Sequence, residues 1–426
     1  MKILIISGTP WDNSNSFGNT FSNLFAGMKN VEIYNISCQN GLSNNNITFK
    51  EVQMSDKSVL KSILNPLYDP CWEVEKSNKE IDVNQALSVA AIKKRWTIFF
   101  IIRDLIWGIG RWKRSKVLKK LIFEHKPDII YLPIYASPRM CNIQQYIIKK
   151  LGVPVVGHIS DDVYNIPPNL SFLGKRYRIH LQKKLKKLIN SCEYLEVFAQ
   201  NMADEYSKKF DIPCFLIGKG VTQEKIASIP PLKKSTNKPL KIIYTGNISQ
   251  DRYSILHLLG TTIDAHFKGK AVIDIYTQSI LPEIMLCELE SIDSIELKGA
   301  VSGEEVLKIQ QSADFLLHAE GFSDKSIFET KMSFSTKIID YMLSGVPILA
   351  VGPSEVNSIA VLQNFDLAAV ISNPEDTKNI LNDLLNGNVD FNKKRENIID
   401  YLKTYRDLDT IQNGIYNRLS DTLNKQ

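Results

Sequence analysis

Short continuous apolar runs alternate with helical patterns along this chain of 426 residues. The first run, Lys2 to Gly8, is stopped by Gly-Thr-Pro and is typical of a buried parallel strand that feeds a loop. The loop is rich in Asn and Ser, contains Phe17-Gly18-Asn19, and passes into a helical pattern at Thr20. Further strand-like runs lie at 31–36, 128–133, 153–159 and 195–199. Strands that alternate with helices predict a parallel sheet with helices on both faces.

A second alternating series follows a break in this pattern. The run Phe215 to Val221 ends in a Gly-containing turn, and polar, Pro-containing sequence up to Lys238 is typical of a linker. Later strand-like runs lie at 241–245, 272–276, 295–297, 315–318, 346–351 and 368–371, with helical patterns at 304–311 and 336–343. These series predict an α/β fold of two doubly wound, Rossmann-like domains. We expect an N-terminal domain over 1–215 and a second domain over 216–404, with a C-terminal helix, 405–426, packed back on the first.

Composition narrows the class of protein. A hydrophobic fraction of 44% and a charged fraction of 23% are ordinary for a soluble globular protein. No window has the roughly 20 apolar residues of a membrane span, since the nearest, Trp96 to Gly110, contains Arg103 and Asp104. The six scattered cysteines predict free thiols in a reducing cytoplasm. Because the six histidines form no H-E-x-x-H motif, we expect no bound metal. Gly108-Ile109-Gly110 lacks the third glycine of a dinucleotide motif and no P-loop motif occurs, so we expect no cofactor.

The net charge of +6 conceals an asymmetry. Residues 1–215 contain 30 Lys and Arg against 19 Asp and Glu, a balance of +11. The excess of basic residues is concentrated at 91–126 and at 174–188. The first stretch also has an aromatic-rich apolar body, and this composition is typical of an interfacial helix on anionic lipid. Solvated helix faces are the simpler interpretation of both stretches. We favour an anionic membrane surface, contacted through 91–120, over nucleic acid, for which no recognition motif is present.

The most informative part of the sequence about a binding site is the segment Ser333 to Gly352, SFSTKIIDYMLSGVPILAVG. It predicts a helix capped by Ser335 or Thr336, a glycine stop and then a buried strand. Free N–H groups at such a helix start form an anion site. Lys337 in the first turn opposes the helix dipole, a conflict that a bound diphosphate would remove. Asp340 lies at i+3 on the same face, from which its carboxylate can accept hydrogen bonds from ribose hydroxyls.

This segment resembles the signature of retaining, sugar-nucleotide-dependent GT-B glycosyltransferases, the group often called family 4. Members that make bacterial surface polysaccharides read S-x-K-[IL]-x-[ED]-Y-[ML]-x-x-G-x-P-[IV]-L-A here. The matching residues are Ser335, Lys337, Ile338, Asp340, Tyr341, Met342, Gly345, Pro347, Ile348, Leu349 and Ala350. The resemblance implies that Asp340 holds the ribose of a nucleoside-diphosphate sugar, while Lys337 and the helix start hold the diphosphate. It also implies transfer with retention to a saccharide acceptor, without a metal.

Other positions follow the family's order in the second domain. The run Tyr244-Thr-Gly246-Asn247, followed by Arg252, resembles the first strand and loop of the donor domain, where a basic residue contacts the diphosphate. The run Leu297-Lys-Gly-Ala-Val301 resembles the strand end that binds the base. The resemblance therefore implies that Gly246, Asn247 and Val301 bind the donor, with Ser335, Thr336 and Asp340, and that Arg252 and Lys337 are catalytic.

In the first domain the resemblance is carried by a glycine and a strand end. Gly18 matches the Gly-containing loop that faces the donor, and Val155 to Asp162 resembles the strand whose end lines the cleft. His158 and Asp161 stand at the catalytic places of that strand end. A satisfied core or loop histidine is the simpler interpretation of His158, and a polar turn is the simpler interpretation of Asp161.

One departure concerns the transferred sugar. Many relatives carry an E-x7-E pair whose first Glu contacts this sugar, but the position eight before Asp340 is Met332. Glu320, Asp324 or Glu329 are candidates to replace it, at a different spacing.

Three functions remain open from the sequence. The first is a glycosyltransferase in cell-surface polysaccharide synthesis, acting on a lipid-linked saccharide at the inner face of the cell membrane. The second is a sugar-nucleotide epimerase or hydrolase on the same fold. The third is a non-enzymatic protein that binds a membrane surface or another polyanion, in which case Lys337 and Asp340 form only a surface ion pair.

Overall fold

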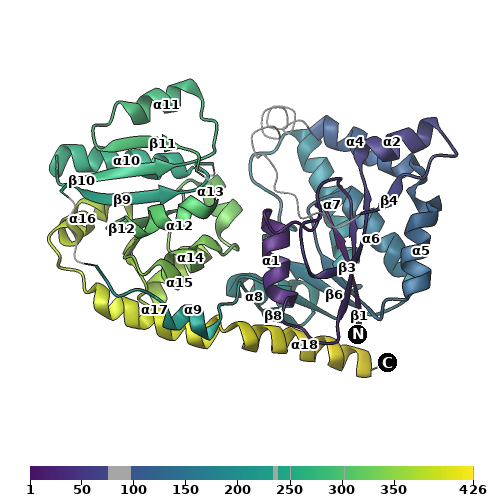
Figure 1. The fold of residues 1–426 in the computed structure, drawn as a ribbon. Helices are drawn as coiled ribbons and strands as arrows, with labels where there is room; N and C mark the ends of the chain where they lie inside the picture. The colour runs from purple at the N-terminus through teal and green to yellow at the C-terminus, as the bar shows by residue number, and fades with distance from the viewer. Residues whose placement is uncertain (75–96, 234–237, 250, 302, 426) are drawn as a thin grey trace. The chain divides into compact units, whose positions relative to one another are not determined.

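The computed structural model describes residues 1–74, 97–233, 238–249, 251–301 and 303–425 (Figure 1). Its contacts divide the chain into two compact units, each built around its own sheet. Unit 1 comprises Met1–Phe198, Met202–Gly220 and Leu408–Gln426, and unit 2 comprises Ala199–Asn201 and Val221–Asp407. The chain thus enters unit 2 after Gly220 and returns to unit 1 after Asp407.

Unit 1 contains an eight-stranded sheet in the order β4-β3-β2-β1-β5-β6-β7-β8. All neighbouring strands are parallel except β4, which runs antiparallel to β3. The strands are β1 Lys2–Ser7, β2 Glu32–Ser37, β3 Thr48–Met54, β4 Cys71–Glu73, β5 Ile129–Pro133, β6 Val155–Ile159, β7 Tyr194–Val197 and β8 Cys214–Leu216. Strand order reverses between β1 and β5, and in such sheets ligands bind beyond the carboxyl ends of the strands at this point.

Helices cover both faces of this sheet. They are α1 Ser16–Phe25, α2 Asp56–Leu64, α4 Thr97–Ile109, the 3-10 helix η2 Arg111–Arg114, α5 Lys116–His125, α6 Pro138–Leu151, α7 Phe172–Ile189, α8 Gln200–Phe210 and α18 Leu408–Asn424. Helices α1 and α18 pack together and close one core over β1 and β5, which includes Ile3, Phe21, Tyr131 and Ile415. The last helix of the chain is therefore part of the first unit.

Unit 2 contains a six-stranded, all-parallel sheet in the order β11-β10-β9-β12-β13-β14. Its strands are β9 Leu240–Thr245, β10 Ala271–Tyr276, β11 Ile295–Gly299, β12 Phe315–Ala319, β13 Ile348–Val351 and β14 Ala369–Ile371. Its helices are α9 Gln223–Ala227, α10 Arg252–His266, α11 Glu283–Glu290, α12 Gly303–Gln311, α13 Asp324–Thr330, α14 Lys337–Ser344, α15 Asn357–Asn364, η3 Pro374–Asp376, α16 Thr377–Leu385 and α17 Phe391–Tyr405. Ile242 and Ile243 of β9 enter cores on opposite faces of the sheet, as expected for a strand buried on both sides.

Two strands, β3 and β4, were not predicted. One of the two buried faces of β3 is polar, because Gln53 Nε2 donates to Glu51 Oε1 there (3.0 Å) and Ser43 Oγ donates to Glu51 Oε2 (2.8 Å). This buried polar network removes the apolar run by which the other strands are recognised. The C-terminal pattern at 391–424 also differs in detail, since it forms two helices, α17 and α18, separated at Arg406 and Asp407.

The structure bears on three further expectations. None of the helices in the described ranges is both long and apolar enough to span a membrane. All six cysteines are free thiols, as predicted. Of the basic stretch 91–120, residues 91–96 lie outside the described residues, and two of its aromatic residues, Trp107 and Trp112, are buried rather than available to a membrane surface.

Candidate functional site at the switch point of unit 2

The candidate site lies where strand order reverses in unit 2. The chain runs outward through β9, β10 and β11 in one direction and through β12, β13 and β14 in the other, so β9 and β12 flank the switch point. Their carboxyl ends are Thr245 and Ala319. Side chains that follow these two strands are therefore placed where doubly wound sheets bind ligands.

Helix α14 brings Lys337 to this point. The helix begins at Lys337 and ends before Gly345, as the sequence predicts, and Thr336 is its N-cap, although the Thr336 side chain makes no capping hydrogen bond. One turn later, the buried Tyr341 hydroxyl lies 3.1 Å from Thr245 Oγ1 at the end of β9. This bond ties the second turn of α14 to the carboxyl end of β9.

Lys337 and Gly246 are in direct contact. A Cβ built on Gly246 would lie 2.4 Å from Lys337 Nζ, so any side chain at this position would collide with the ammonium group. The φ of Gly246 is +155°, a value that residues with a side chain rarely adopt. Glycine at 246 thus allows the ammonium of Lys337 to lie against the backbone at the end of β9.

Arg252 and Glu320 form an ion pair beside this contact. Arg252 is the first residue of α10, and its Nη2 donates to Glu320 Oε2 (3.1 Å) and Oε1 (3.3 Å). Its Nε donates to the carbonyl oxygen of Ala319, at 3.0 Å. Glu320 follows β12 and is 2% exposed, so its carboxylate is a buried counter-ion for the cations of the site.

The electrostatics of the site couple four side chains. Loss of solvent, and next the charge of Arg252, lower the pKa of Lys337. Burial raises the pKa of Glu320, while Arg252 and Lys337 oppose this rise. Burial, with the same two cations, lowers the pKa of His318 to about 3, so its imidazole is neutral. His318 Nε2 lies 3.4 Å from Glu320 Oε1 and makes no hydrogen bond within the described residues.

The remaining predicted donor residues occupy the rim of this region or a more distant strand. Asp340 is half-buried one turn into α14 and contributes to the field at Lys337. The N–H of Ser335 donates to Ser358 Oγ (3.0 Å), which fixes the approach to α14. Asn247 Oδ1 accepts from the Ser249 N–H (2.7 Å), and so it orders the loop after β9. Val301 follows the edge strand β11, two strands away from β9.

In unit 1, His158 is part of a buried hydrogen-bond chain. Arg418 of α18 donates to Glu196, and Tyr131 Oη donates to Glu196 Oε2 (2.5 Å). Because the Tyr131 proton is used in this way, its oxygen accepts from His158 Nδ1 (3.1 Å), which leaves Nε2 to accept from Ser160 Oγ (3.0 Å). His158 is 2% exposed and burial lowers its pKa to about 3. The structure thus places a neutral, fully partnered imidazole in the core beneath the end of β6.

Asp161 lies after a strand end of unit 1, and Gly18 lies in a helix of the same unit. Asp161 is exposed just after β6, two residues beyond the last strand residue. Gly18 lies in the first turn of α1 rather than in the preceding loop, so the expectation of a loop up to Asn19 was wrong. A Cβ on Gly18 would lie 2.0 Å from the carbonyl oxygen of Asp12, so glycine allows α1 to pack against the loop after β1.

Sequence reasoning left Glu320 as one of three candidates and did not consider His318. Asp324 and Glu329 are exposed on α13, and Met332 is buried, so Glu320 is the acidic residue of the three that meets the cations. Part of the signal was present in the sequence, because Glu320 follows the predicted strand at 315–318. Among the residues that the structure describes, no three His, Cys, Asp or Glu side chains gather as a metal site requires.

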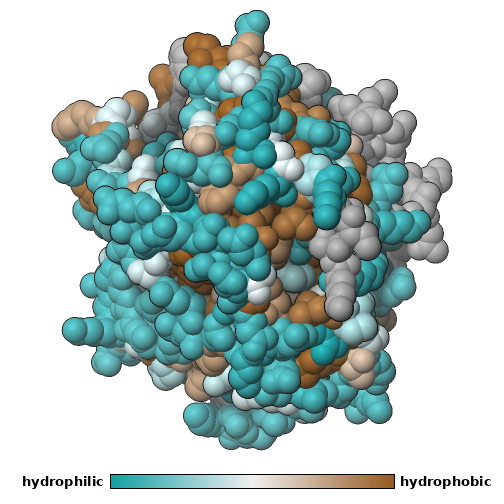
Figure 2. Space-filling model, turned by 90° about the vertical axis from the view of Figure 1, so that its left-hand side faces the viewer, coloured by the Kyte–Doolittle hydropathy of each residue, from teal (hydrophilic) through white to brown (hydrophobic). Residues whose placement is uncertain are grey.

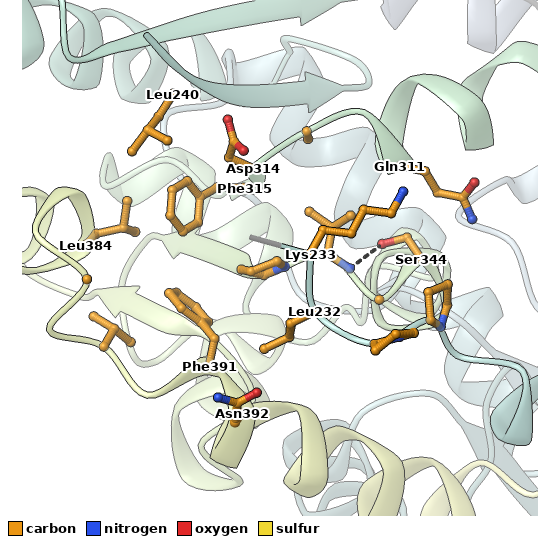
Figure 3. Close-up of a pocket in the computed structure, with 18 of the residues that line it drawn as sticks. Leu232, Lys233, Leu240, Gln311, Asp314, Phe315, Ser344, Leu384, Phe391 and Asn392 are labelled. Carbon is orange, nitrogen blue, oxygen red and sulfur yellow. Dashed lines mark hydrogen bonds between the residues drawn. The ribbon is translucent and has the colours of Figure 1, made fainter. Parts of the chain in front are cut away.

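A cavity of about 960 Å³ lies at the other edge of the unit 2 sheet. It is lined by residues at the amino ends of the strands, including Leu240 and Phe315, with Phe391 and Leu384 beside them and Gln311 on the opposite wall (Figure 3). The face of unit 2 turned to the viewer in Figure 2 is mostly hydrophilic, with hydrophobic residues showing between. Because this cavity is at the amino edge, it is distinct from the switch-point site.

Solved structures match the chain along nearly its whole length, whereas no protein-family model and no curated protein matches it. HepE from Anabaena, in complex with UDP, is 12% identical, with a TM-score of 0.64 over 99% of this chain and 100% of that one. The lipopolysaccharide outer core galactosyltransferase WaaB is 12% identical, with a TM-score of 0.58 over 98% and 100%. Sucrose-phosphate synthase from Thermosynechococcus elongatus is 10% identical, with a TM-score of 0.61 over 100% of both chains.

These likenesses concern the fold. The chain has the α/β architecture with parallel sheets that is found in structures of GT-B glycosyltransferases. The predicted fold class is confirmed.

Proposed function

We propose that this protein is a glycosyltransferase that uses a nucleoside-diphosphate sugar. The observation that carries the proposal is the meeting of Lys337, Arg252 and Gly246 at the switch point of unit 2, beside the start of α14. Two cations, a side-chain-free backbone approach and a helix N-terminus together suit a diphosphate. That HepE, which has the same fold, was solved with UDP supports this choice of ligand.

In the proposed reaction, the site stabilises the leaving diphosphate. Lys337, Arg252 and the N–H groups of α14 take up the negative charge that develops as the bond between the sugar and the phosphate breaks. Asp340 holds the ribose, with Ser335 and Thr336 at the helix start. The acceptor hydroxyl attacks the same face of the sugar carbon, and its proton passes to the departing phosphate oxygen. The anomeric configuration is then retained, as in family 4 enzymes, and the cations serve in place of a metal.

We further propose that unit 1 receives the acceptor, a saccharide carried on a lipid, for cell-surface polysaccharide synthesis on the cytoplasmic side of a membrane. The excess of basic residues in 1–215 supports an anionic membrane surface as a partner. In this proposal His158 is a positioning residue rather than a catalytic one. Its bond to Ser160 orders the end of β6, after which Asp161 is exposed.

A sugar-nucleotide epimerase or hydrolase is the second candidate. The buried carboxylate of Glu320 beside the neutral His318 favours it, because such a pair is an acid–base arrangement that diphosphate binding does not require. Product formed without any acceptor would decide for this candidate.

Nucleotide-dependent thermal stability tests the proposal. The wild type and Asp340→Ala are unfolded with UDP, GDP, TDP or CMP, without metal. A ligand at about 100 times its Kd stabilises by about 2.7 kcal/mol, which raises the Tm of a domain of this size by several degrees. We expect one nucleotide to give this rise in the wild type and in a control, Glu355→Ala, on an exposed part of unit 2, but not in Asp340→Ala. No rise with any nucleotide would refute the donor site and favour a non-enzymatic binding protein.

A further inference from the structure

Helix α4 turns an apolar stripe outward. Ile98, Ile102, Leu105 and Ile109 follow the spacing i, i+4, i+7 and i+11, and they are 51%, 47%, 59% and 69% exposed. A surface helix normally shows the opposite arrangement, with its apolar stripe on the core and its polar side in water. The described residues therefore leave an apolar helix face uncovered.

Polar anchors on the inward side of α4 hold this orientation. Tyr177 of α7 donates its hydroxyl proton to Asp104 Oδ2 (2.9 Å), and Trp107 Nε1 donates to Asp56 Oδ1 of α2 (2.6 Å). Arg139 of α6 pairs with the same Asp56 (2.8 Å) and lies 4.7 Å over the Trp107 ring. Turning α4 so that its stripe faced the core would break the contacts that Asp104 and Trp107 make. The exposed stripe is therefore a fixed feature of unit 1.

The start of α7 extends this apolar face. A Cβ on Gly174 would lie 3.8 Å from Thr97 Oγ1, which places the first turns of α7 and α4 side by side. Phe172 and Leu173, in the same turn of α7, are 76% and 47% exposed. We call the following six residues the α4–α7 face: Ile98, Ile102, Leu105, Ile109, Phe172 and Leu173.

Cations border the α4–α7 face. Lys113 and Arg114 are exposed just beyond the end of α4, and Lys175 and Arg176 are exposed in the first turns of α7. The only acidic residue within α4, η2 and α7 is Asp104, which is bonded inward. An apolar centre with these exposed cations beside it suits a surface that offers hydrocarbon beneath a layer of negative charge.

We propose that the α4–α7 face docks unit 1 on an anionic lipid bilayer. The aliphatic and Phe172 side chains would enter the headgroup boundary, and the bordering Lys and Arg would pair with lipid phosphates. The stripe spans about 16 Å along α4, at about 1.5 Å per residue, so the helix lies in the interface plane. The inference builds on the proposed function, which places the acceptor on a lipid, and it identifies which residues make the contact.

Co-sedimentation with vesicles tests this inference on the full chain. Vesicles of phosphatidylcholine alone are compared with vesicles that also contain phosphatidylglycerol. The test variants are Ile102→Ser with Leu105→Ser, and separately Phe172→Ser. The matched control is Ile284→Ser, which removes an apolar side chain as exposed as Phe172 (75% against 76%) from α11 of unit 2.

We expect the wild type and Ile284→Ser to bind only the anionic vesicles, and each test variant to bind them at least tenfold more weakly. Equal binding by all variants, or no binding by the wild type, would overturn the inference. The inference would also be overturned if substitutions in the α4–α7 face changed the oligomeric state but left vesicle binding unchanged. That result would assign the face to a contact between proteins. The UDP-dependent Tm rise, measured in the same variants, should be unchanged, so failure of the donor site is recorded separately.

Discussion

Glu320→Gln removes the negative charge that faces Arg252 while keeping the size of the side chain. The carboxylate is 2% exposed and accepts two contacts from Arg252 Nη2, at 3.1 and 3.3 Å. Breaking a buried ion pair from one side costs about 3–5 kcal/mol when both charges are fully buried. Arg252 keeps partial solvent access and its bond to the Ala319 carbonyl oxygen, so we expect a loss of about 2 kcal/mol.

The same substitution should strengthen nucleotide binding. Lys337 and Arg252 supply two positive charges to the site, and Glu320 and Asp340 supply two negative charges, so removal of one carboxylate leaves the site at +1. At an effective dielectric constant of about 20, a unit charge about 8 Å from a phosphate contributes about 2 kcal/mol. Because the rim of the site is open to solvent, we expect the Kd for UDP to fall by about tenfold.

Thermal unfolding with and without UDP separates the two effects. Without nucleotide, the Tm should fall by about 4–8 °C for a unit of this size. The rise in Tm on adding UDP should be larger than in the wild type, and calorimetry should give the lower Kd. Glu329→Gln, on the exposed side of α13, is the control and should change neither quantity. Weaker UDP binding by Glu320→Gln would refute this reasoning, because it would mean that Glu320 is needed to hold Arg252 on the phosphate.

Two further substitutions make independent predictions. Gly246→Ala places a Cβ 2.4 Å from Lys337 Nζ and should displace the ammonium group from the site. A charge-assisted hydrogen bond contributes about 1.5–3 kcal/mol, and the variant should lose the one between Lys337 and the diphosphate. Calorimetry should therefore show UDP binding at least tenfold weaker than in the wild type. Gly269→Ala, at a φ of +75° with open space around it, is its control, and equal UDP affinity in both would contradict the role of Lys337. His158 stays neutral in the folded state, with a pKa of about 3, whereas the unfolded chain binds its proton below about pH 6.5, so stability is lost as pH falls. Between pH 7 and 5 the free energy of unfolding of the wild type should therefore fall by about 2 kcal/mol more than that of His158→Gln. If the two proteins lose stability equally over this pH range, His158 is not buried as a neutral group.

Much of unit 2 could be predicted because its elements are locally specified. The strand runs at 241–245 and 315–318 have apolar centres, 242–244 and 315–317, since a central parallel strand is buried on both faces. Helix α14 has its limits marked by its own residues, with a polar start and Gly345 at its end. Lys337 was recognised for the same reason, because a cation in the first turn of a helix conflicts with the dipole unless an anion binds there.

Elements with buried polar side chains could not be predicted in this way. Strand β3 carries Glu51 and Gln53 inward, and helix α4 carries Asp104 inward, because partners from other segments satisfy them. A hydropathy pattern assumes that polar side chains face water. It therefore missed β3 and could not show which apolar residues of α4 face outward and which, such as Trp107, are buried.

The sequence by itself determined the strand and helix alternation, the limits of α14 and the position of Lys337, because these depend on contacts within a few residues. Tertiary structure decided which distant side chains meet. Arg252 and Glu320 are 68 positions apart and pair only because β9 and β12 are neighbours in the sheet. Arg418 meets Glu196 across 222 positions because the last helix returns to unit 1. Strand order and chain return are long-range properties, and local periodicity carries no information about them.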